Sequence, residues 1–136
     1  MILYQNSLIC LNYDPSSDII VVEYKELHNV LIPEIKHSIH ILIETVKNYD
    51  IKRILLDSSQ TKKIVNEDNA FEITMFLAKE MLKTRIQKVA RLQSPSSDVE
   101  NSTQSNWALV KTLWPIPFDL QDFRNKQEAL LWLKEI

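Results

Sequence analysis

Residues 8–25 read LICLNYDPSSDIIVVEYK, and this stretch decides how the chain begins to fold. Two runs rich in Ile, Val, Leu and Tyr, residues 8–13 and 18–25, flank the segment Asp14-Pro15-Ser16-Ser17. β-Branched and aromatic residues favour strands, whereas Asp, Pro and Ser favour the turn between them. The stretch therefore predicts an antiparallel β-hairpin near the N-terminus.

After the hairpin, helix and strand patterns alternate. Pro33 can open a helix, and apolar residues recur at helical spacing up to Tyr49. The short apolar run Arg53–Asp57 is typical of a buried strand. Asn66 can cap a second helix that runs to about Thr84. Residues 87–92 predict another strand, which is less apolar and is therefore expected nearer an edge of the sheet.

The polar residues 94–106 allow two interpretations. Ser97 and Glu100 have the spacing of a capping box, which favours a helix that starts near Asp98. Alternatively the segment is a loop, and the helix starts near Ser105. In either case residues 114–117, Trp-Pro-Ile-Pro, end the helix.

Near the C-terminus, residues 118–123 predict a last short strand. Asn125 and Glu128 repeat the capping pattern before a final amphipathic helix. The expected order is β-β-α-β-α-β-α-β-α. This order implies an α/β domain in which helices pack on a mixed sheet of four to five strands. We expect residues 1–136 to form this single domain.

This order and three stretches of sequence resemble the STAS domain family, which has the fold of anti-sigma-factor antagonists. The closest likeness is to small stand-alone bacterial members described as STAS/SEC14-like. The stretches are the opening hairpin with Val22-Glu23-Tyr24, the strand at residues 52–57, and Phe123 followed by residues 128–133. The resemblance spans nearly the whole chain and implies a regulatory or binding role.

Family members with a known role use a serine at the start of the second helix as a phosphorylation switch. Here residues 66–69, Asn-Glu-Asp-Asn, stand at the corresponding place and contain no hydroxyl group. Glu67 and Asp68 put fixed negative charge there instead, and we expect them to face a protein partner. Asp57-Ser58-Ser59 is similar to the phosphorylated motif in its letters but lies at a strand end and lacks the glycine that follows in the family.

Composition excludes several classes of function. The chain contains no glycine, so it cannot form the glycine-rich loops that cradle phosphates, and we expect no cofactor. A net charge of −2, from 16 basic and 18 acidic residues, gives no reason to expect nucleic acid or an anionic membrane surface. The single Cys10 and the lack of a signal peptide or long apolar span predict a cytoplasmic protein.

The end of the strand at Asp57 is the candidate ligand site. Ligands of open α/β sheets favour the crevice beyond the carboxyl ends of the strands, and Ser58, Ser59 and Thr61 follow there with hydroxyl groups. In the other interpretation, Asp57 only accepts hydrogen bonds from loop N–H groups and ends the strand. We favour this structural role for Asp57, and both interpretations stay open.

Two other groups of side chains are candidate sites. His37 and His40 lie three residues apart on the first helix, with His28 just before it, but no ligand motif supports a metal site. Trp114, beside Pro115, is expected to be partly exposed and to contribute to a partner interface.

Three functional hypotheses follow. The first is a non-enzymatic regulatory or protein-interaction module that can form a homodimer. It predicts a pocket-poor structure with an exposed apolar patch. The second is a small-molecule or lipid carrier, which requires a cavity on the order of several hundred Å³ between sheet and helices. The third, an enzyme centred on Asp57 or the histidines, ranks last because no nucleophile and base can be assembled from spacing.

Overall fold

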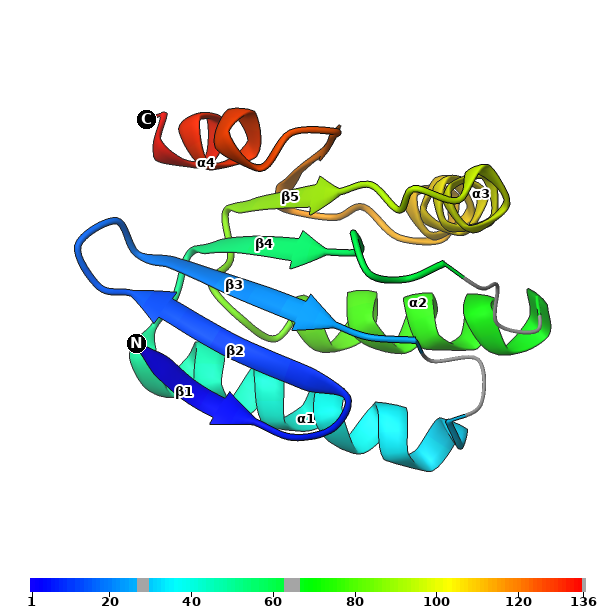
Figure 1. Cartoon of the computed structure of the whole chain (residues 1–136), viewed down its shortest axis with the longest axis horizontal. Coiled ribbons are helices and arrows are strands. Elements are labelled where there is room, and N and C mark those ends of the chain that lie inside the picture. The colour runs from blue at the N-terminus through cyan, green and yellow to red at the C-terminus, as the bar shows by residue number, and fades with distance from the viewer. Residues whose placement is uncertain (27–29, 63–66, 136) are drawn as a thin grey trace.

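A computed structural model describes residues 1–26, 30–62 and 67–135 of the chain. It shows an α/β domain with one six-stranded mixed sheet and four helices (Figure 1). The strands lie in chain order across the sheet. The elements are β1 Ile2–Gln5, β2 Ile9–Asp14, β3 Ile19–Tyr24, α1 Ile32–Tyr49, β4 Arg53–Asp57, α2 Glu67–Met81, β5 Lys88–Leu92, α3 Ser97–Leu113, β6 Asp119–Phe123 and α4 Lys126–Lys134.

The predicted hairpin is confirmed as β2 and β3, which pair antiparallel from Ile9–Tyr24 to Asp14–Ile19. From β3 to β6 every neighbouring pair is parallel. Each connecting segment therefore returns along the sheet, and the strand that follows runs in the same direction as the one before. Because such crossovers are right-handed, all three connecting helices come to lie on one face of the sheet. The other face is left to α4.

The buried residues fall into two clusters, one on each side of the sheet. The larger cluster joins β2–β5 to α1, α2 and α3, and includes Leu11, Ile20, Ile43 and Trp107. The smaller cluster places Ala129 and Leu133 of α4 against Leu55 and other residues of β3–β5. Alternate residues of each central strand thus serve opposite faces, since side chains in a strand have a period of two.

Helix ends mostly agree with the sequence patterns. Pro33 stands in the first turn of α1, and Asp50 ends that helix in the left-handed conformation, at φ 51°. Asn125 caps α4 by accepting a hydrogen bond from the Glu128 N–H, as the spacing predicted. The predicted cap of α2, Asn66, lies outside the described residues.

The structure decides between the two interpretations of residues 94–106. α3 begins at Ser97, close to the earlier of the two predicted starts. Its cap is Ser96, one residue before the capping-box serine, and the Ser96 side chain accepts from the Val99 N–H. The helix ends at Trp114, which is followed by two prolines, as expected.

The expected mixed sheet is present, with one strand more than the four to five predicted, because Ile2–Gln5 pairs with β2 at the edge. β5 lies next to the edge strand β6, and four of its five residues are buried. Arg91 lowers the apolar content of this strand, but Glu100 and Asp122 compensate its charge within the fold.

Candidate functional site: a pocket between the sheet and three helices

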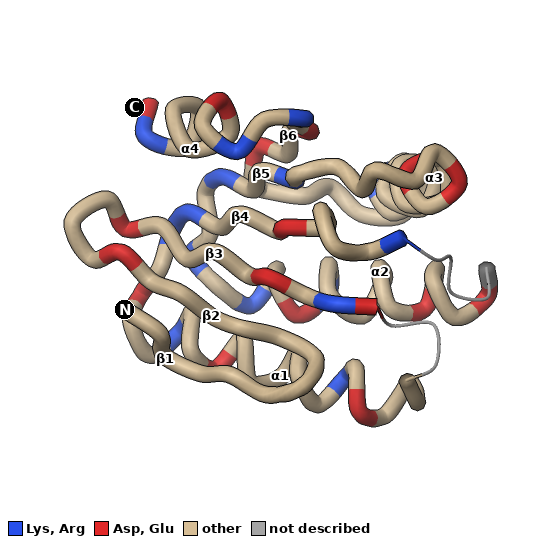
Figure 2. Tube along the Cα trace, viewed as in Figure 1, with Lys and Arg blue, Asp and Glu red and all other residues tan. Residues whose placement is uncertain are grey.

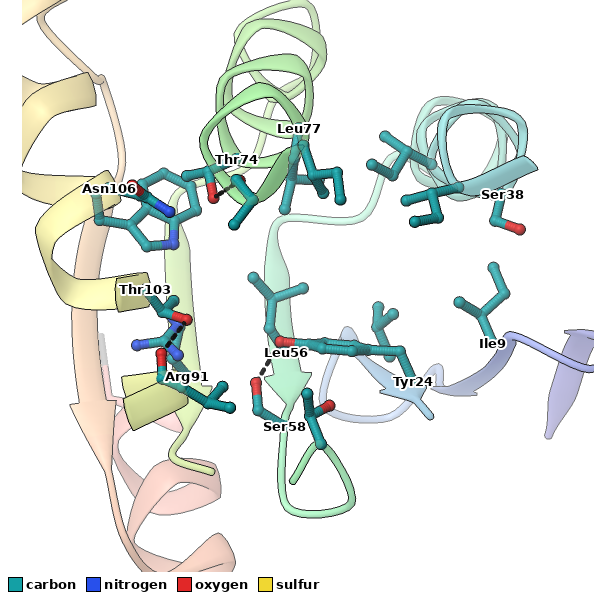
Figure 3. Close-up of a pocket in the computed structure, with 18 of the residues that line it drawn as sticks. Ile9, Tyr24, Ser38, Leu56, Ser58, Thr74, Leu77, Arg91, Thr103 and Asn106 are labelled. Carbon is teal, nitrogen blue, oxygen red and sulfur yellow. Dashed lines mark hydrogen bonds between the residues drawn. The ribbon is translucent and has the colours of Figure 1, made fainter. Parts of the chain in front are cut away.

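A cavity of about 160 Å³ lies between the sheet and helices α1, α2 and α3 (Figure 3). Half of the twenty residues that line it are aliphatic. Its residues are Ile9, Val22, Tyr24, Ile35, Ser38, Ile39, Leu42, Leu56, Ser58, Thr61, Ala70, Ile73, Thr74, Leu77, Arg91, Val99, Ser102, Thr103, Asn106 and Trp107. The cavity contradicts the pocket-poor structure that the interaction hypothesis predicted. It is also smaller than the lipid-carrier hypothesis required.

The lining follows from the periodicities of strands and helices. Val22 and Tyr24 are two apart on β3, and alternate residues of a strand face the same side. On α2, Ala70, Ile73 or Thr74, and Leu77 are spaced three and four apart, which brings them to one face. Figure 3 shows Leu56 and Tyr24 of the sheet across the cavity from Thr74 and Leu77 of α2.

Hydroxyl groups gather where β3 and β4 end. The Tyr24 hydroxyl and Ser58 Oγ hydrogen bond to each other across 34 residues of sequence (Figure 3). Ser58 is held by its N–H, which donates to the Leu92 carbonyl at 3.0 Å. Burial raises the pKa of Tyr24 above its ordinary value, although Arg91 and the Ser58 hydrogen bond oppose the shift. Tyr24 therefore stays a neutral phenol at pH 7.

Thr61 differs from the other threonines of the lining. Its side chain is buried, and Oγ1 has no hydrogen-bond partner among the residues that the structure describes. By contrast, Thr74 Oγ1 donates to the Ala70 carbonyl at 3.0 Å, and Thr103 Oγ1 donates to the Val99 carbonyl at 2.9 Å. Buried hydroxyl groups in native proteins usually have a partner, so the described part of the chain leaves the Thr61 hydroxyl group unsatisfied.

Arg91 is the charged residue of the described lining, and it is fully paired by two carboxylates. Its Nη2 donates to Glu100 Oε1 at 3.0 Å, and its Nη1 donates to Asp122 Oδ1 at 2.7 Å. Burial by itself would lower the pKa of Arg91, but Tyr24, Glu100 and Asp122 outweigh it and the pKa is raised. The guanidinium is therefore a permanent cation inside a permanent ion network.

The structure brings together two of the four residues predicted to bind a ligand. Ser58 and Thr61 line the cavity. Asp57 is buried next to them but is not in the lining, and its Oδ1 accepts the Ser59 N–H at 2.9 Å, which is the structural role considered above. Ser59 is exposed. A ligand-binding role for these residues stays a prediction.

The residues predicted for a partner interface lie at separate places. Asp68 is exposed in the first turn of α2, and the side chain of Glu67 lies outside the described part of the chain. Trp114 is partly buried at the end of α3, with Lys79 Nζ 5.6 Å from the centre of its ring. Their role in an interface stays a prediction.

His37 and His40 are exposed on α1, and His28 falls outside the described residues. Within residues 1–26, 30–62 and 67–135, no three His, Cys, Asp or Glu side chains are grouped as a metal site would need. Figure 2 shows acidic and basic positions interspersed over sheet and helices. None of the described helices combines the length and the apolar character that crossing a bilayer needs.

Sequence reasoning missed Tyr24 and Arg91. Tyr24 lies two residues after Val22 and Arg91 two residues after Val89, so each shares the face of a buried valine, and a polar residue at such a position was the available signal. A buried arginine requires an acidic partner, which here comes from other elements.

Comparison with known proteins adds little to this description. No model of a known protein family matches the chain, and no curated protein matches it. A chain in the crystal structure of the diguanylate cyclase SiaD in complex with its activator SiaC, from Pseudomonas aeruginosa, is 11% identical to this one. The match covers 90% of this chain and 99% of that chain, with a TM-score of 0.45. At this identity and TM-score, the likeness says nothing about the function of the pocket.

Proposed function

We propose that this chain is a non-enzymatic, STAS-like binding module whose pocket takes one small and mostly apolar molecule. The observation that carries the proposal is the cavity of about 160 Å³ between the sheet and three helices. An apolar cavity of roughly 150 Å³ is large enough for benzene. The ligand is therefore of that size, and a long-chain lipid would not fit.

The chemistry of the lining supports binding rather than catalysis. Among the described lining residues there is no His, Cys, Asp, Glu or Lys. Tyr24 and Arg91 both have raised pKa values, and so neither serves as a base at pH 7. Hydroxyl groups without a neighbouring base are poor nucleophiles.

Toluene tests the proposal directly, because it has the right size and no polar group. In a ¹H–¹⁵N NMR titration, we expect saturable shifts at residues around the pocket, such as Leu56 and Leu77. Ala70→Phe places a ring into the cavity and should abolish these shifts. Ala108→Phe is the matched control, since Ala108 is exposed on α3 and does not line the pocket.

The proposal fails if toluene causes no saturable shift, or if the shifts map to the surface and persist in Ala70→Phe. Native mass spectrometry of freshly purified protein is an independent check for a molecule that co-purifies. Both substituted proteins must unfold cooperatively for the comparison to count.

A protein-interaction role is a second candidate, favoured by an apolar strip on α3. Leu109 and Leu113 are one turn apart and are 51% and 54% exposed. Exposed leucines in a row on one helix face indicate a contact surface. We propose that this strip mediates self-association into a dimer.

Light scattering after gel filtration tests this second role. A concentrated sample should have the mass of a dimer, and Leu109→Lys with Leu113→Lys should convert it to the 16.0 kDa monomer. Leu131→Lys on α4 is the control, because Leu131 is also exposed but lies on the other side of the sheet. A wild-type protein that stays monomeric at high concentration refutes the dimer.

A further inference from the structure

We infer that the molecule bound in the pocket carries an uncharged hydrogen-bonding group, which Thr61 Oγ1 contacts, and that the pocket rejects anions. This inference rests on the proposed function and names the chemical class of the ligand. Two independent observations lead to it. One is the unpartnered hydroxyl group of Thr61, and the other is the neutralisation of Arg91.

Two hydrogen bonds fix the backbone of Thr61, whereas its hydroxyl group forms none with the described residues. Its N–H donates to the Ser58 carbonyl at 3.0 Å, and its carbonyl accepts a hydrogen bond from Ser94 Oγ. The residue is only 6% exposed, its side chain lines the cavity, and Oγ1 lacks a partner within residues 1–26, 30–62 and 67–135. A ligand that offers a donor or an acceptor there would satisfy a group that is costly to leave alone.

Arg91 would be the natural partner of an anionic ligand, but its charge is already compensated. The guanidinium is 2% exposed and contacts both Glu100 and Asp122. Glu100 Oε1 also accepts the Ser94 N–H at 2.8 Å, which holds the carboxylate in place. One positive and two negative charges leave this network with a net charge of −1.

An anion in the pocket would therefore lose its hydration and lie beside the network of Arg91, Glu100 and Asp122, whose net charge is already −1. A cation would likewise lose its hydration, and no carboxylate of the described lining would contact it in return. An alcohol, ketone or amide loses far less hydration, and it still forms the hydrogen bond with Thr61. The pocket thus favours a neutral ligand with one polar end.

Three probes that share a benzene ring test this inference: benzyl alcohol, toluene and benzoate. Their dissociation constants are measured by ¹H–¹⁵N NMR at pH 7. Benzyl alcohol should bind roughly 2- to 10-fold more tightly than toluene, the range that one neutral hydrogen bond supplies. Benzoate should bind the most weakly of the three.

Thr61→Val removes the hydroxyl group and keeps the shape of the side chain. In this protein, benzyl alcohol should bind no more tightly than toluene, while the affinity for toluene changes less than about 2-fold. Thr45→Val is the matched control, since the Thr45 hydroxyl group donates to the Ile41 carbonyl at 2.8 Å and Thr45 does not line the pocket. This substitution should leave the ratio between the two affinities unchanged.

Each outcome separates the inference from the proposed function. Equal binding of benzyl alcohol and toluene by the wild-type protein overturns the role of Thr61, and a water molecule then satisfies its hydroxyl group. Preferred binding of benzoate overturns the argument about Arg91. In both cases the pocket still binds ligands, so the proposed function survives. If none of the three probes binds, the proposed function itself is wrong. The order of the three affinities in the wild-type protein tests the inference even if Thr61→Val does not fold.

Discussion

Replacing Glu100 by glutamine should strongly destabilise the fold, although the two side chains have nearly the same shape. Glu100 Oε1 accepts hydrogen bonds from Arg91 Nη2 and from the Ser94 N–H, at 3.0 and 2.8 Å. Glutamine has one acceptor oxygen, and its NH₂ group would face the donors of Arg91. The substitution therefore leaves a buried cation with a single carboxylate partner.

The magnitude follows from the burial of the pair. Removing one partner of a buried ion pair costs about 3–5 kcal/mol of the free energy of unfolding. Asp122 still contacts Arg91 Nη1 at 2.7 Å, which keeps the expected loss near the lower end, at about 3 kcal/mol. For a domain of this size, that loss lowers the melting temperature by roughly 10 °C.

Urea unfolding followed by circular dichroism measures the loss, and two further variants control it. Asp122→Asn should cost only about 1 kcal/mol, because the Asp122 side chain is 33% exposed and water screens it. The double variant Arg91→Met with Glu100→Gln removes the buried cation as well. It should be more stable than Glu100→Gln alone, since an apolar side chain needs no partner. A double variant that is less stable than Glu100→Gln, or a Glu100→Gln that costs no more than Asp122→Asn, would refute this reasoning.

Three smaller predictions concern the rest of the fold. Leu56→Ala enlarges the cavity at a buried position and should cost about 2–5 kcal/mol in urea unfolding, whereas Leu56→Met should cost less than about 1.5 kcal/mol. Asn125→Ala removes the cap that accepts the Glu128 N–H and should cost about 1 kcal/mol, read from the melting temperature. Burial and the hydrogen bond to Asp18 raise the pKa of Tyr13 to about 12. Because the folded pKa lies above the unfolded value near 10, stability should fall as the pH rises from 10 to 12, and Tyr13→Phe should remove this part of the decline.

The local elements were predictable because their signals involve residues close together in the sequence. The hairpin around Asp14-Pro15 and the strand Arg53–Asp57 both appear where the patterns placed them. β1 escaped notice because its four residues are partly exposed and lack a run of strand-forming residues long enough to recognise. Whether β5 lies inside the sheet could not be predicted, since that depends on β6 and α4 packing beside it.

The candidate site also combines local features that the sequence predicted with long-range contacts that it did not. The rule for open α/β sheets indicated the end of β4, and Ser58 and Thr61 lie in the lining there. The hydroxyl pair of Tyr24 and Ser58 spans 34 residues, and no local pattern connects the two. The two leading hypotheses required either a pocket-poor structure or a lipid-sized cavity, whereas the observed volume of about 160 Å³ results from how closely three helices approach the sheet.

Sequence alone determined the order of strands and helices from β2 onward, the cap of α4 at Asn125, and the absence of glycine-rich phosphate loops. These features depend on backbone preferences and on periodicities of a few residues. Only the tertiary structure decided that Arg91 is neutralised and that the Thr61 hydroxyl group has no partner among the described residues. The reason is that charge compensation and hydrogen bonding depend on distances between elements, which exist only once the helices have packed on the sheet.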